Sequence, residues 1–382
     1  MKITFVSNFF NHHQLPFCSE LLKRCDEFYF IVTEPVPEDR TKFGYEDLNT
    51  KYDFILRTYD GSMQESRLYE ILEKSDVVIF GSCPNEYIDY RMKFNKLSFL
   101  YSERFLKKGV WRRHIPTTRR KIHDRIVKHK DKELYVLCAS SFLSWDLQLC
   151  GFNPDKCFRW GYFPQVNEYA ERPQRNNDPV RILWAGRMLP LKHAETAVEA
   201  VSQLKARGLG FTLDFIGMGE CEKALKKQVR QLGLDKEVRF LGSMTPKKVI
   251  ENMEQSDVFL MTSNFREGWG AVINEAMSTG CAVVTSSAVG CAPYLIKDGE
   301  NGLVYKFTDN KDFADKLAKV VGDKEYMNKL GENAFRTLHE QWCVHVAAER
   351  FIEFVSSKDK AAFSYESGPM SKAPVIKNDW YK

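Results

Sequence analysis

The sequence predicts an α/β protein made of two doubly wound parallel sheets, each covered by helices on both faces. Short apolar runs alternate with amphipathic stretches from one end of the chain to the other, and strand–helix alternation of this kind builds parallel sheets. The 382 residues, of which 43% are hydrophobic and 28% charged, suffice for two ordinary globular domains. A small disulfide-stapled module and a disordered chain are thereby excluded.

The first half of the chain contains six candidate strands, each a short apolar run between polar residues. They are Ile3–Val6, Phe28–Val32, Phe54–Arg57, Val77–Phe80, Leu97–Tyr101 and Leu134–Cys138. Helical periodicity fills several of the intervals, notably Leu15–Arg24, Met63–Glu73 and Arg112–His129. We therefore expect a first Rossmann-like domain over residues 1–171.

A second series of strands follows a polar segment, 172–179, that is flanked by prolines and reads as a linker. The series comprises Ile182–Ala185, Leu213–Ile216, Val238–Leu241, Val258–Met261, Ala282–Thr285 and Leu303–Tyr305. We expect a second domain over 180–343 and a C-terminal helix over 344–356 that returns towards the first domain. The polar tail, 357–382, is either loosely ordered or docked by its isolated aromatic rings.

The net charge of +5 is concentrated in one segment. Between Arg104 and Lys132, twelve lysines and arginines stand against two aspartates, so this segment carries +10 and the rest of the chain −5. Its middle, Arg112–His129, has the pattern of a basic helix, with Trp111 just before it and three apolar residues, Ile115, Ile122 and Ile126. Such a helix suits an anionic membrane surface. The alternatives are a solvated helix face and nucleic-acid binding, and the segment lacks the interleaved aromatics typical of the latter.

No apolar run approaches the roughly 18–20 residues that span a bilayer, and the N-terminus reads as a strand rather than as a leader. The ten cysteines occur singly, without a Cys-x-x-Cys pair or a histidine at zinc spacing. We therefore expect reduced thiols and a cytoplasmic protein, peripherally attached to the cytoplasmic face of the membrane through the basic segment.

The stretch Glu267–Met277 carries the clearest chemistry. It follows the apolar run Val258–Met261, so a strand ends here and a helix is expected from Gly270 to Gly280. Ligands of open α/β sheets bind at the carboxyl ends of strands. Gly268 and Gly270 would let the backbone approach an anion, and the helix N-terminus offers free N–H groups, so the pattern predicts a diphosphate site.

Two carboxylates flank this predicted diphosphate site, Glu267 in the turn and Glu275 in the helix. Carboxylates repel phosphates but accept hydrogen bonds from hydroxyls, so one suits a sugar and the other a ribose. The alternative is that both are ordinary solvated acids.

The run Glu-Gly-Trp-Gly-Ala-Val-Ile-Asn-Glu-Ala-Met resembles the signature of the family 4 retaining glycosyltransferases, the group 1 enzymes of the GT-B fold. Four further segments resemble motifs of that family in the same order along the chain. They are Ala185-Gly186-Arg187 with Lys192, Phe215–Gly219, Val238–Gly242 and Asp298–Val304. The resemblance extends from about Val180 to His345.

The resemblance implies two Rossmann-like domains that face a central cleft, with a nucleotide diphosphate sugar bound in the C-terminal domain. It implies a catalytic set, Glu267, Arg187 and Lys192, in which the cations grip the diphosphate. The implied donor contacts are Glu275, Gly217, Gly219, Gly268, Trp269, Gly270, Ala271 and Val272. It implies no cofactor and no metal, in keeping with a sequence that has no Asp-x-Asp. The residues alone leave other interpretations open. The two cations could be solvated, and the glycines of Phe215–Gly219 could form an ordinary β–α turn. The ring of Trp269 could pack in the core.

The N-terminal half departs from the family pattern. Many members have glycines in the first β–α turn, where this chain has Asn8–Gln14, and often a histidine near the place of Glu103. His12, His13 and Glu103 follow predicted strands at their carboxyl ends, so we expect them to contact the acceptor. Helix capping and packing are the alternatives for the two histidines.

The sequence thus predicts transfer of a hexosyl group from a UDP-sugar to a hydroxyl of a glycan or lipid-linked acceptor. The expected context is the synthesis of bacterial-type cell-surface polysaccharide or glycolipid. Retention of anomeric configuration follows from the resemblance alone. The alternatives are a GT-B phosphorylase or epimerase and a non-catalytic nucleic-acid-binding protein on a degenerate GT-B scaffold.

Overall fold

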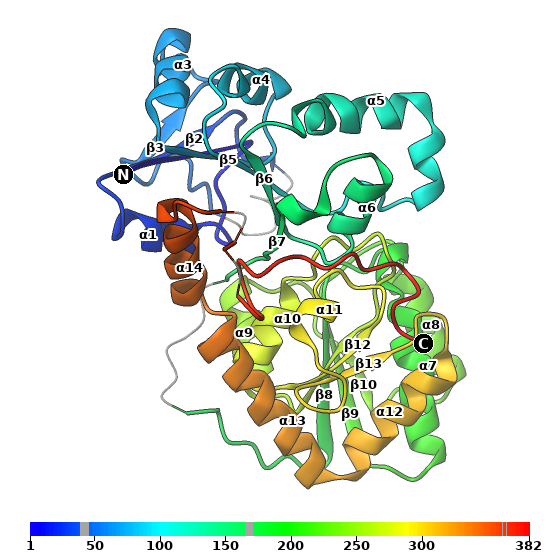
Figure 1. Cartoon of the computed structure of the whole chain (residues 1–382). Coiled ribbons are helices and arrows are strands. Elements are labelled where there is room, and N and C mark those ends of the chain that lie inside the picture. The colour runs from blue at the N-terminus through cyan, green and yellow to red at the C-terminus, as the bar shows by residue number, and fades with distance from the viewer. Residues whose placement is uncertain (39–45, 165–170, 361, 364) are drawn as a thin grey trace. The chain divides into compact units, whose positions relative to one another are not determined.

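The computed structural model describes residues 1–38, 46–164, 171–360, 362–363 and 365–382. It divides into two compact units, each built on one parallel sheet (Figure 1). Unit 1 comprises Met1–Gln165 and Trp342–Lys377, and unit 2 comprises Val166–Gln341 and Asn378–Lys382. The segment 172–179, expected as a linker, is thus part of unit 2.

The sheet of unit 1 has seven strands in the order β3-β2-β1-β4-β5-β6-β7. Their bounds are Lys2–Ser7 (β1), Glu27–Val32 (β2), Ile55–Arg57 (β3), Val77–Phe80 (β4), Ser98–Ser102 (β5), Leu134–Cys138 (β6) and Cys157–Arg159 (β7). β1 pairs with β2 from Lys2↔Glu27 to Ser7↔Val32 and with β4 on its other side. The strand order therefore reverses beside β1.

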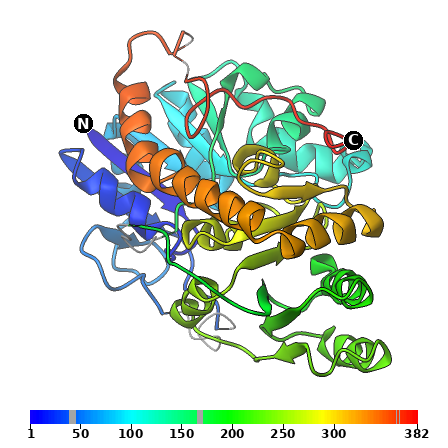
Figure 2. The ribbon, with the colours of Figure 1, turned by 90° about the horizontal axis from the view of Figure 1, so that it is seen from below.

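Helices cover both faces of this sheet (Figure 1). α3 (Glu65–Lys74), α4 (Asn85–Lys93) and α5 (Pro116–Arg125) lie on one face, and α6 (Leu143–Leu149) follows β6. α1 (Leu15–Leu22) and α14 (Val344–Ser356) lie side by side on the other face (Figure 1, Figure 2). Phe351 and Phe354 of α14 pack on Phe99 of β5, with ring centroids 5.0 and 5.6 Å apart. The C-terminal helix is thus part of the core of unit 1.

The sheet of unit 2 has six strands in the order β10-β9-β8-β11-β12-β13. Their bounds are Val180–Ala185 (β8), Phe211–Ile216 (β9), Val238–Phe240 (β10), Val258–Met261 (β11), Ala282–Ser286 (β12) and Leu303–Tyr305 (β13). α7 (Ala194–Ala206), α8 (Glu222–Gln231) and α12 (Asn310–Gly322) cover one face (Figure 1). α9 (Pro246–Glu254), α10 (Val272–Ser278) and α13 (Lys324–Arg336) cover the other, and α11 (Ala292–Leu295) is a single short turn.

Two arginines hold the segment 172–179 on unit 2. Arg172 donates to the carbonyl of Gly280 at 3.0 Å, and Arg175 donates to the same carbonyl at 2.8 Å and to that of Glu254 at 2.7 Å. These carbonyls lie at the C-terminal ends of α10 and α9, where the helix dipole favours a cation.

The predicted fold class is confirmed, since both halves are doubly wound parallel sheets. All twelve predicted strands are present, with ends within two residues of those expected. Among the described residues, β7 is the strand that the sequence does not predict, because its three residues are too few to show a pattern.

The basic segment does not form the single helix predicted over Arg112–His129. It folds as a 3₁₀ turn (Val110–His114), then α5, then a second 3₁₀ turn (Val127–His129). Pro116 starts α5 because proline has no N–H for a preceding helical turn. Two of the three apolar residues of the predicted helix, Ile122 and Ile126, are buried within unit 1. The prediction of one amphipathic helix is therefore wrong.

The cations of this segment divide into two groups. Four make contacts within unit 1: Arg104 is buried in an ion pair with Asp146 at 2.8 Å, Lys107 pairs with Glu103, Lys128 pairs with Asp89, and Arg125 donates to the carbonyl of Cys83 at 2.6 Å. The other eight are Lys108, Arg119, Arg120, Lys121, Lys130 and Lys132, which are exposed, and Arg112 and Arg113, which are half-buried; Arg120 lies 3.6 Å from Asp124. Trp111, among them, is 60% exposed.

The tail docks through its aromatic rings, one of the two alternatives left open above. Trp380 Nε1 donates to the carbonyl of Ser287 at 2.8 Å, and the Tyr381 hydroxyl donates to Asp298 Oδ2 at 2.5 Å. The ammonium of Lys316 lies 4.7 Å from the Tyr381 ring centroid. The last residues of the chain are therefore fixed on unit 2. The ten cysteines are free thiols, and within the described ranges no helix is long and apolar enough to cross a bilayer.

Candidate active site

The candidate donor site lies on two loops of unit 2 that follow neighbouring strands. β8 pairs with β11 on one side and with β9 on the other, so the strand order reverses at β8. The β8–α7 loop carries Arg187 and Lys192, and the β11–α10 loop carries Glu267. Both loops leave the carboxyl ends of their strands, at the switch point where open α/β sheets bind ligands.

The structure brings two of the predicted catalytic residues into contact. Lys192 Nζ lies 2.5 Å from Glu267 Oε2, and the two side chains are 17% and 16% exposed. Ser263, which is fully buried, donates from its hydroxyl to the same carboxylate oxygen at 3.0 Å. The carboxylate is thus held from two sides and still reaches the surface.

Hydrogen bonds tie these two loops together. The indole N–H of Trp184 in β8 donates to the Thr262 hydroxyl at 3.0 Å, and that hydroxyl donates to the carbonyl of Lys192 at 2.6 Å. The amide of Asn264 donates to the carbonyl of Leu191 at 2.9 Å. The separation of Lys192 and Glu267 is therefore set by the backbone of both loops.

Gly217 and Gly219 follow β9 and pack closely against the β8–α7 loop. A Cβ at Gly217 would lie 2.0 Å from the carbonyl oxygen of Gly186, and one at Gly219 would lie 2.4 Å from that of Met188. Gly217 also has φ of +125°. Glycine is required at both positions by loop packing, independently of a nucleotide, and the predicted nucleotide contact remains a prediction.

The other donor residues lie on the β8–α7 loop and around the start of α10. Arg187 is exposed, and no partner for its guanidinium is present among the described residues. Gly270 has φ of +92°, and a Cβ there would lie 2.8 Å from Val289. Gly268 is buried, and Ala271 caps α10 without a side-chain hydrogen bond just before Val272 begins it.

The ring of Trp269 belongs to the core. It is fully buried, and its Nε1 donates to Asn274 Oδ1 at 2.8 Å. The Trp269 carbonyl accepts from the amide of Cys291 at 2.9 Å. Only the backbone of this residue is left for a ligand, as the core alternative anticipates.

Glu275 lies half-buried in the first turn of α10. Burial raises the pKa of this carboxyl to about 7. Within the part of the chain that the structure describes, no side chain or amide donates to the carboxylate. A half-buried carboxylate that accepts no hydrogen bond from the protein is suited to accept one from a hydroxyl group of a ligand.

In unit 1, the three predicted acceptor residues lie in one group at the carboxyl edge of the sheet. The rings of His12 and His13 are 3.8 Å apart, and the ring of Tyr162 lies 5.5 Å from that of His13. The Tyr162 hydroxyl donates to Glu103 Oε1 at 3.0 Å, and Lys107 pairs with the other oxygen. The chain thus brings together residues that follow β1, β5 and β7.

Sequence reasoning missed Ser263 and Tyr162. Ser263 comes two residues after β11, a position that by itself marks a strand end. Tyr162 lies in the aromatic run Trp160–Phe163, and the unpredicted strand β7 places it at the sheet edge. Among the described residues, no group of three or more His, Cys, Asp or Glu is arranged to hold a metal ion.

A comparison with known proteins assigns part of the chain to a protein family. Residues 165–337 match the family model of glycosyl transferases group 1. This segment of the chain belongs to the group 1 glycosyl transferases. The predicted family is thereby confirmed, and the group 1 domain holds every donor residue described above.

Two curated relatives illustrate the sequence similarity. The lipopolysaccharide core biosynthesis glycosyltransferase LpsE of Rhizobium meliloti is 30% identical over 177 residues, which are 46% of this chain and 50% of LpsE. A GDP-mannose-dependent phosphatidylinositol monomannoside mannosyltransferase of Mycobacterium tuberculosis is 25% identical over 204 residues, 52% of this chain and 53% of that protein. The chain thus spans about half the length of the curated relatives that it matches.

Solved structures share the fold over nearly the whole chain. HepE of Anabaena in complex with UDP has a TM-score of 0.71 at 15% identity, covering 93% of this chain and 100% of HepE. The lipopolysaccharide outer core galactosyltransferase WaaB has a TM-score of 0.67 at 17% identity, covering 94% and 100%. The fold of both units is therefore that of the GT-B glycosyltransferases.

Proposed function

We propose that this protein transfers a hexosyl group from a UDP-sugar to an acceptor hydroxyl, with retention of configuration and without a metal ion. The observation that carries the proposal is the Lys192–Glu267 pair at the switch point of a group 1 domain. The proposed context is the synthesis of cell-surface polysaccharide or glycolipid. Support comes from the name of LpsE and from HepE structures with UDP and UDP-glucose.

In the proposed reaction, the bond between the anomeric carbon and the diphosphate oxygen breaks. A bond from the acceptor oxygen forms on the same face, and the acceptor proton passes to the departing diphosphate. Arg187 and Lys192 stabilise the charge that develops on the diphosphate. Since an ammonium has three N–H donors, Lys192 can hold Glu267 and a phosphate oxygen together. Glu267 accepts hydrogen bonds from the sugar, and Glu275 from the ribose.

The acceptor is proposed to bind the group formed by His12, His13, Glu103 and Tyr162. Glu103 offers acceptor atoms, the Tyr162 hydroxyl donates and accepts, and the two imidazoles, tilted by 44° to one another, lie in the same group. Such a mixture suits the hydroxyls of a glycan or a lipid-linked sugar.

A donor screen followed by a transfer assay tests the proposal. UDP, GDP and ADP and their hexose conjugates are compared by thermal shift, where a ligand at a hundred times its Kd stabilises the protein by about 2.7 kcal/mol. Transfer is then followed with a glycan acceptor, and the anomeric configuration of the product is read by NMR. Full activity in a chelator is expected, and inactivation that magnesium or manganese restores would contradict the metal-free mechanism.

Variants at the two carboxylates separate the proposed roles. Glu267→Ala should abolish transfer but leave UDP binding intact, whereas Glu275→Ala should weaken UDP itself. An equal loss of UDP affinity in both would overturn the assignment. Hydrolysis or isomerisation of the donor without an acceptor would indicate the phosphorylase or epimerase alternative.

We further propose that the exposed cations of the basic segment, together with Trp111, hold the protein on anionic membranes. Each cation near such a surface contributes about 1 kcal/mol. Sedimentation with phosphatidylserine vesicles should show binding that falls as salt rises. It should weaken in a variant with four arginines changed to Gln: Arg112, Arg113, Arg119 and Arg120.

A matched control removes four exposed cations from α8 in unit 2: Lys223, Lys226, Lys227 and Arg230. It changes the net charge equally and should bind as the parent does. Equal weakening in both variants would show that only net charge matters. Tighter binding to RNA or duplex DNA than to vesicles would favour the nucleic-acid alternative.

A further inference from the structure

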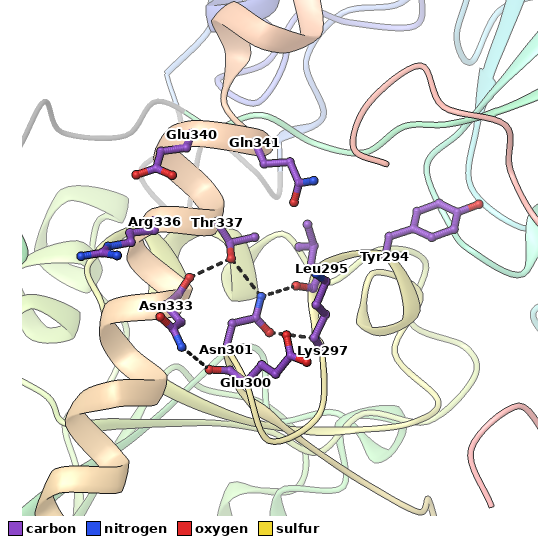
Figure 3. A pocket seen from close by; sticks show the side chains of 10 residues that line it. All are labelled: Tyr294, Leu295, Lys297, Glu300, Asn301, Asn333, Arg336, Thr337, Glu340 and Gln341. Carbon is purple, nitrogen blue, oxygen red and sulfur yellow. Dashed lines mark hydrogen bonds between the residues drawn. The ribbon is translucent and has the colours of Figure 1, made fainter. Parts of the chain in front are cut away.

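Unit 2 contains a cavity that none of the predicted donor residues lines. Its volume is about 590 Å³, and it lies between the loop from α11 to β13 and the C-terminal end of α13 (Figure 3). This volume is within the ~300–1,000 Å³ typical of small-molecule sites. The cavity is thus large enough to be a binding site of its own.

The wall of this cavity is built around Asn301, which is buried. Its side-chain oxygen accepts from the amide of Lys297 at 2.7 Å, and its Nδ2 donates to the carbonyl of Leu295 at 2.9 Å and to the Thr337 hydroxyl at 3.0 Å (Figure 3). Asn333 Nδ2 donates to the carbonyl of Glu300 at 2.7 Å. The wall is therefore fixed by internal hydrogen bonds before a ligand arrives.

The rim of the cavity is charged but balanced. Lys297, Arg336, Glu300 and Glu340 line the cavity and are exposed, and Arg336 also pairs with Glu332 at 3.2 Å. Two cations and two carboxylates favour neither an anion nor a cation. They offer both donors and acceptors to a neutral ligand whose groups can donate and accept, as sugar hydroxyls do.

One end of the cavity has an unusual backbone. Tyr294 and Leu295 also line the cavity, but they are only 8% and 1% exposed and offer a ligand little apolar surface. α13 continues into a π-helical turn, Thr337–Gln341, and three residues of this turn line the cavity. Single π-helical turns are rare and occur frequently at functional sites.

We propose that this cavity binds a neutral hexose oligosaccharide, at a site separate from the donor site. The inference rests on the lining of the cavity and stands without the proposed transferase activity. In a transferase, the site would hold a glycan chain at a distance from the reacting sugar.

Isothermal titration calorimetry with four neutral trisaccharides tests this site: maltotriose, isomaltotriose, cellotriose and mannotriose. At least one should bind with a Kd of about 1 mM or tighter, and inorganic phosphate and glucuronate should bind more weakly. Glu340→Gln and Lys297→Met should each weaken trisaccharide binding about ten-fold, as expected for loss of a hydrogen bond to a charged group. Glu325→Gln, the same change on the exposed first turn of α13, is the matched control and should bind as the parent does.

UDP binding is measured in the same variants. Trisaccharide binding lost while UDP binding persists supports the proposal. The proposal is overturned if no trisaccharide binds, if phosphate or glucuronate binds more tightly, or if both rim variants bind as the control does. UDP binding without trisaccharide binding would refute this site and leave the proposed transferase function standing.

Discussion

Replacing Glu275 by Gln should make the protein more stable at pH 8 and lower its affinity for UDP. Burial raises the pKa of this carboxyl to about 7 in the folded chain, against 4.5 for an ordinary glutamate. One unit of pKa corresponds to about 1.4 kcal/mol. Because the side chain is only half-buried and keeps some contact with water, we take the cost of ionising it in the folded state as about 1–3 kcal/mol.

The sign of the effect follows from proton binding. Below pH 4.5 the carboxyl is protonated in both the folded and the unfolded chain, so it costs nothing. Between pH 4.5 and 7 the folded chain binds more protons than the unfolded one, so stability falls as pH rises. Above pH 7 the full cost is present. A glutamine carries no charge at any pH and removes this cost.

The assay is urea unfolding of parent and variant at pH 5 and pH 8. We expect Glu275→Gln to raise the free energy of unfolding by about 1–3 kcal/mol at pH 8 and by little at pH 5. Glu251→Gln, on the exposed surface of α9, is the control and should change neither value. An advantage of equal size at both pH values would refute the raised pKa.

Binding of UDP provides an independent readout of the same residue. A ribose hydroxyl that donates to the carboxylate favours its ionised form, so the affinity of the parent for UDP should fall as pH drops below 7. In Glu275→Gln the affinity should be weaker by about 1.5–3 kcal/mol and independent of pH over this range. Unchanged UDP affinity in the variant would remove the ribose role and leave the stability argument intact.

Three further outcomes are expected. Ser263→Ala should lower kcat about ten-fold without changing UDP affinity, because it removes the hydrogen bond that holds one side of Glu267. Ser263→Thr should keep more of the rate than Ser263→Ala, and a loss of UDP affinity in place of a loss of kcat would contradict a positioning role. Asp146→Asn should cost about 3–5 kcal/mol of stability in urea unfolding, because it leaves Arg104 charged and buried, and an unaffected midpoint would count against the ion pair. Trp380→Ala should speed hydrogen exchange around Ser287 and leave unit 1 unchanged, whereas uniform exchange would show that the tail does not dock.

The fold could be predicted from the sequence because its determinants are local. Buried parallel strands are continuous apolar runs, so Val77–Phe80 and Val258–Met261 are recognised without any knowledge of their neighbours. The donor loop is recognised for the same reason, since Glu267 and Glu275 are eight residues apart in one strand–turn–helix segment. A three-residue strand such as β7 has no such pattern.

Features that depend on distant partners could not be predicted. Arg104 counts as one more cation of a basic segment, yet Asp146, 42 residues away, buries it. Tyr162 reaches Glu103 across 59 residues because β5, β6 and β7 pair side by side. The prediction of a basic helix is wrong for a related reason, since two of its three apolar residues, Ile122 and Ile126, are buried in the core of unit 1.

The glycines after β9 connect the family motif to the geometry of the site. A methyl group at Gly219 would push the carbonyl of Met188, and one at Gly217 would push that of Gly186, so either would displace the backbone that leads to Lys192. Thr262 and Asn264 bond this same backbone to the loop that carries Glu267. The glycines therefore act on the Lys192–Glu267 pair through packing, and a motif associated with nucleotide binding need not touch the nucleotide to be required for it.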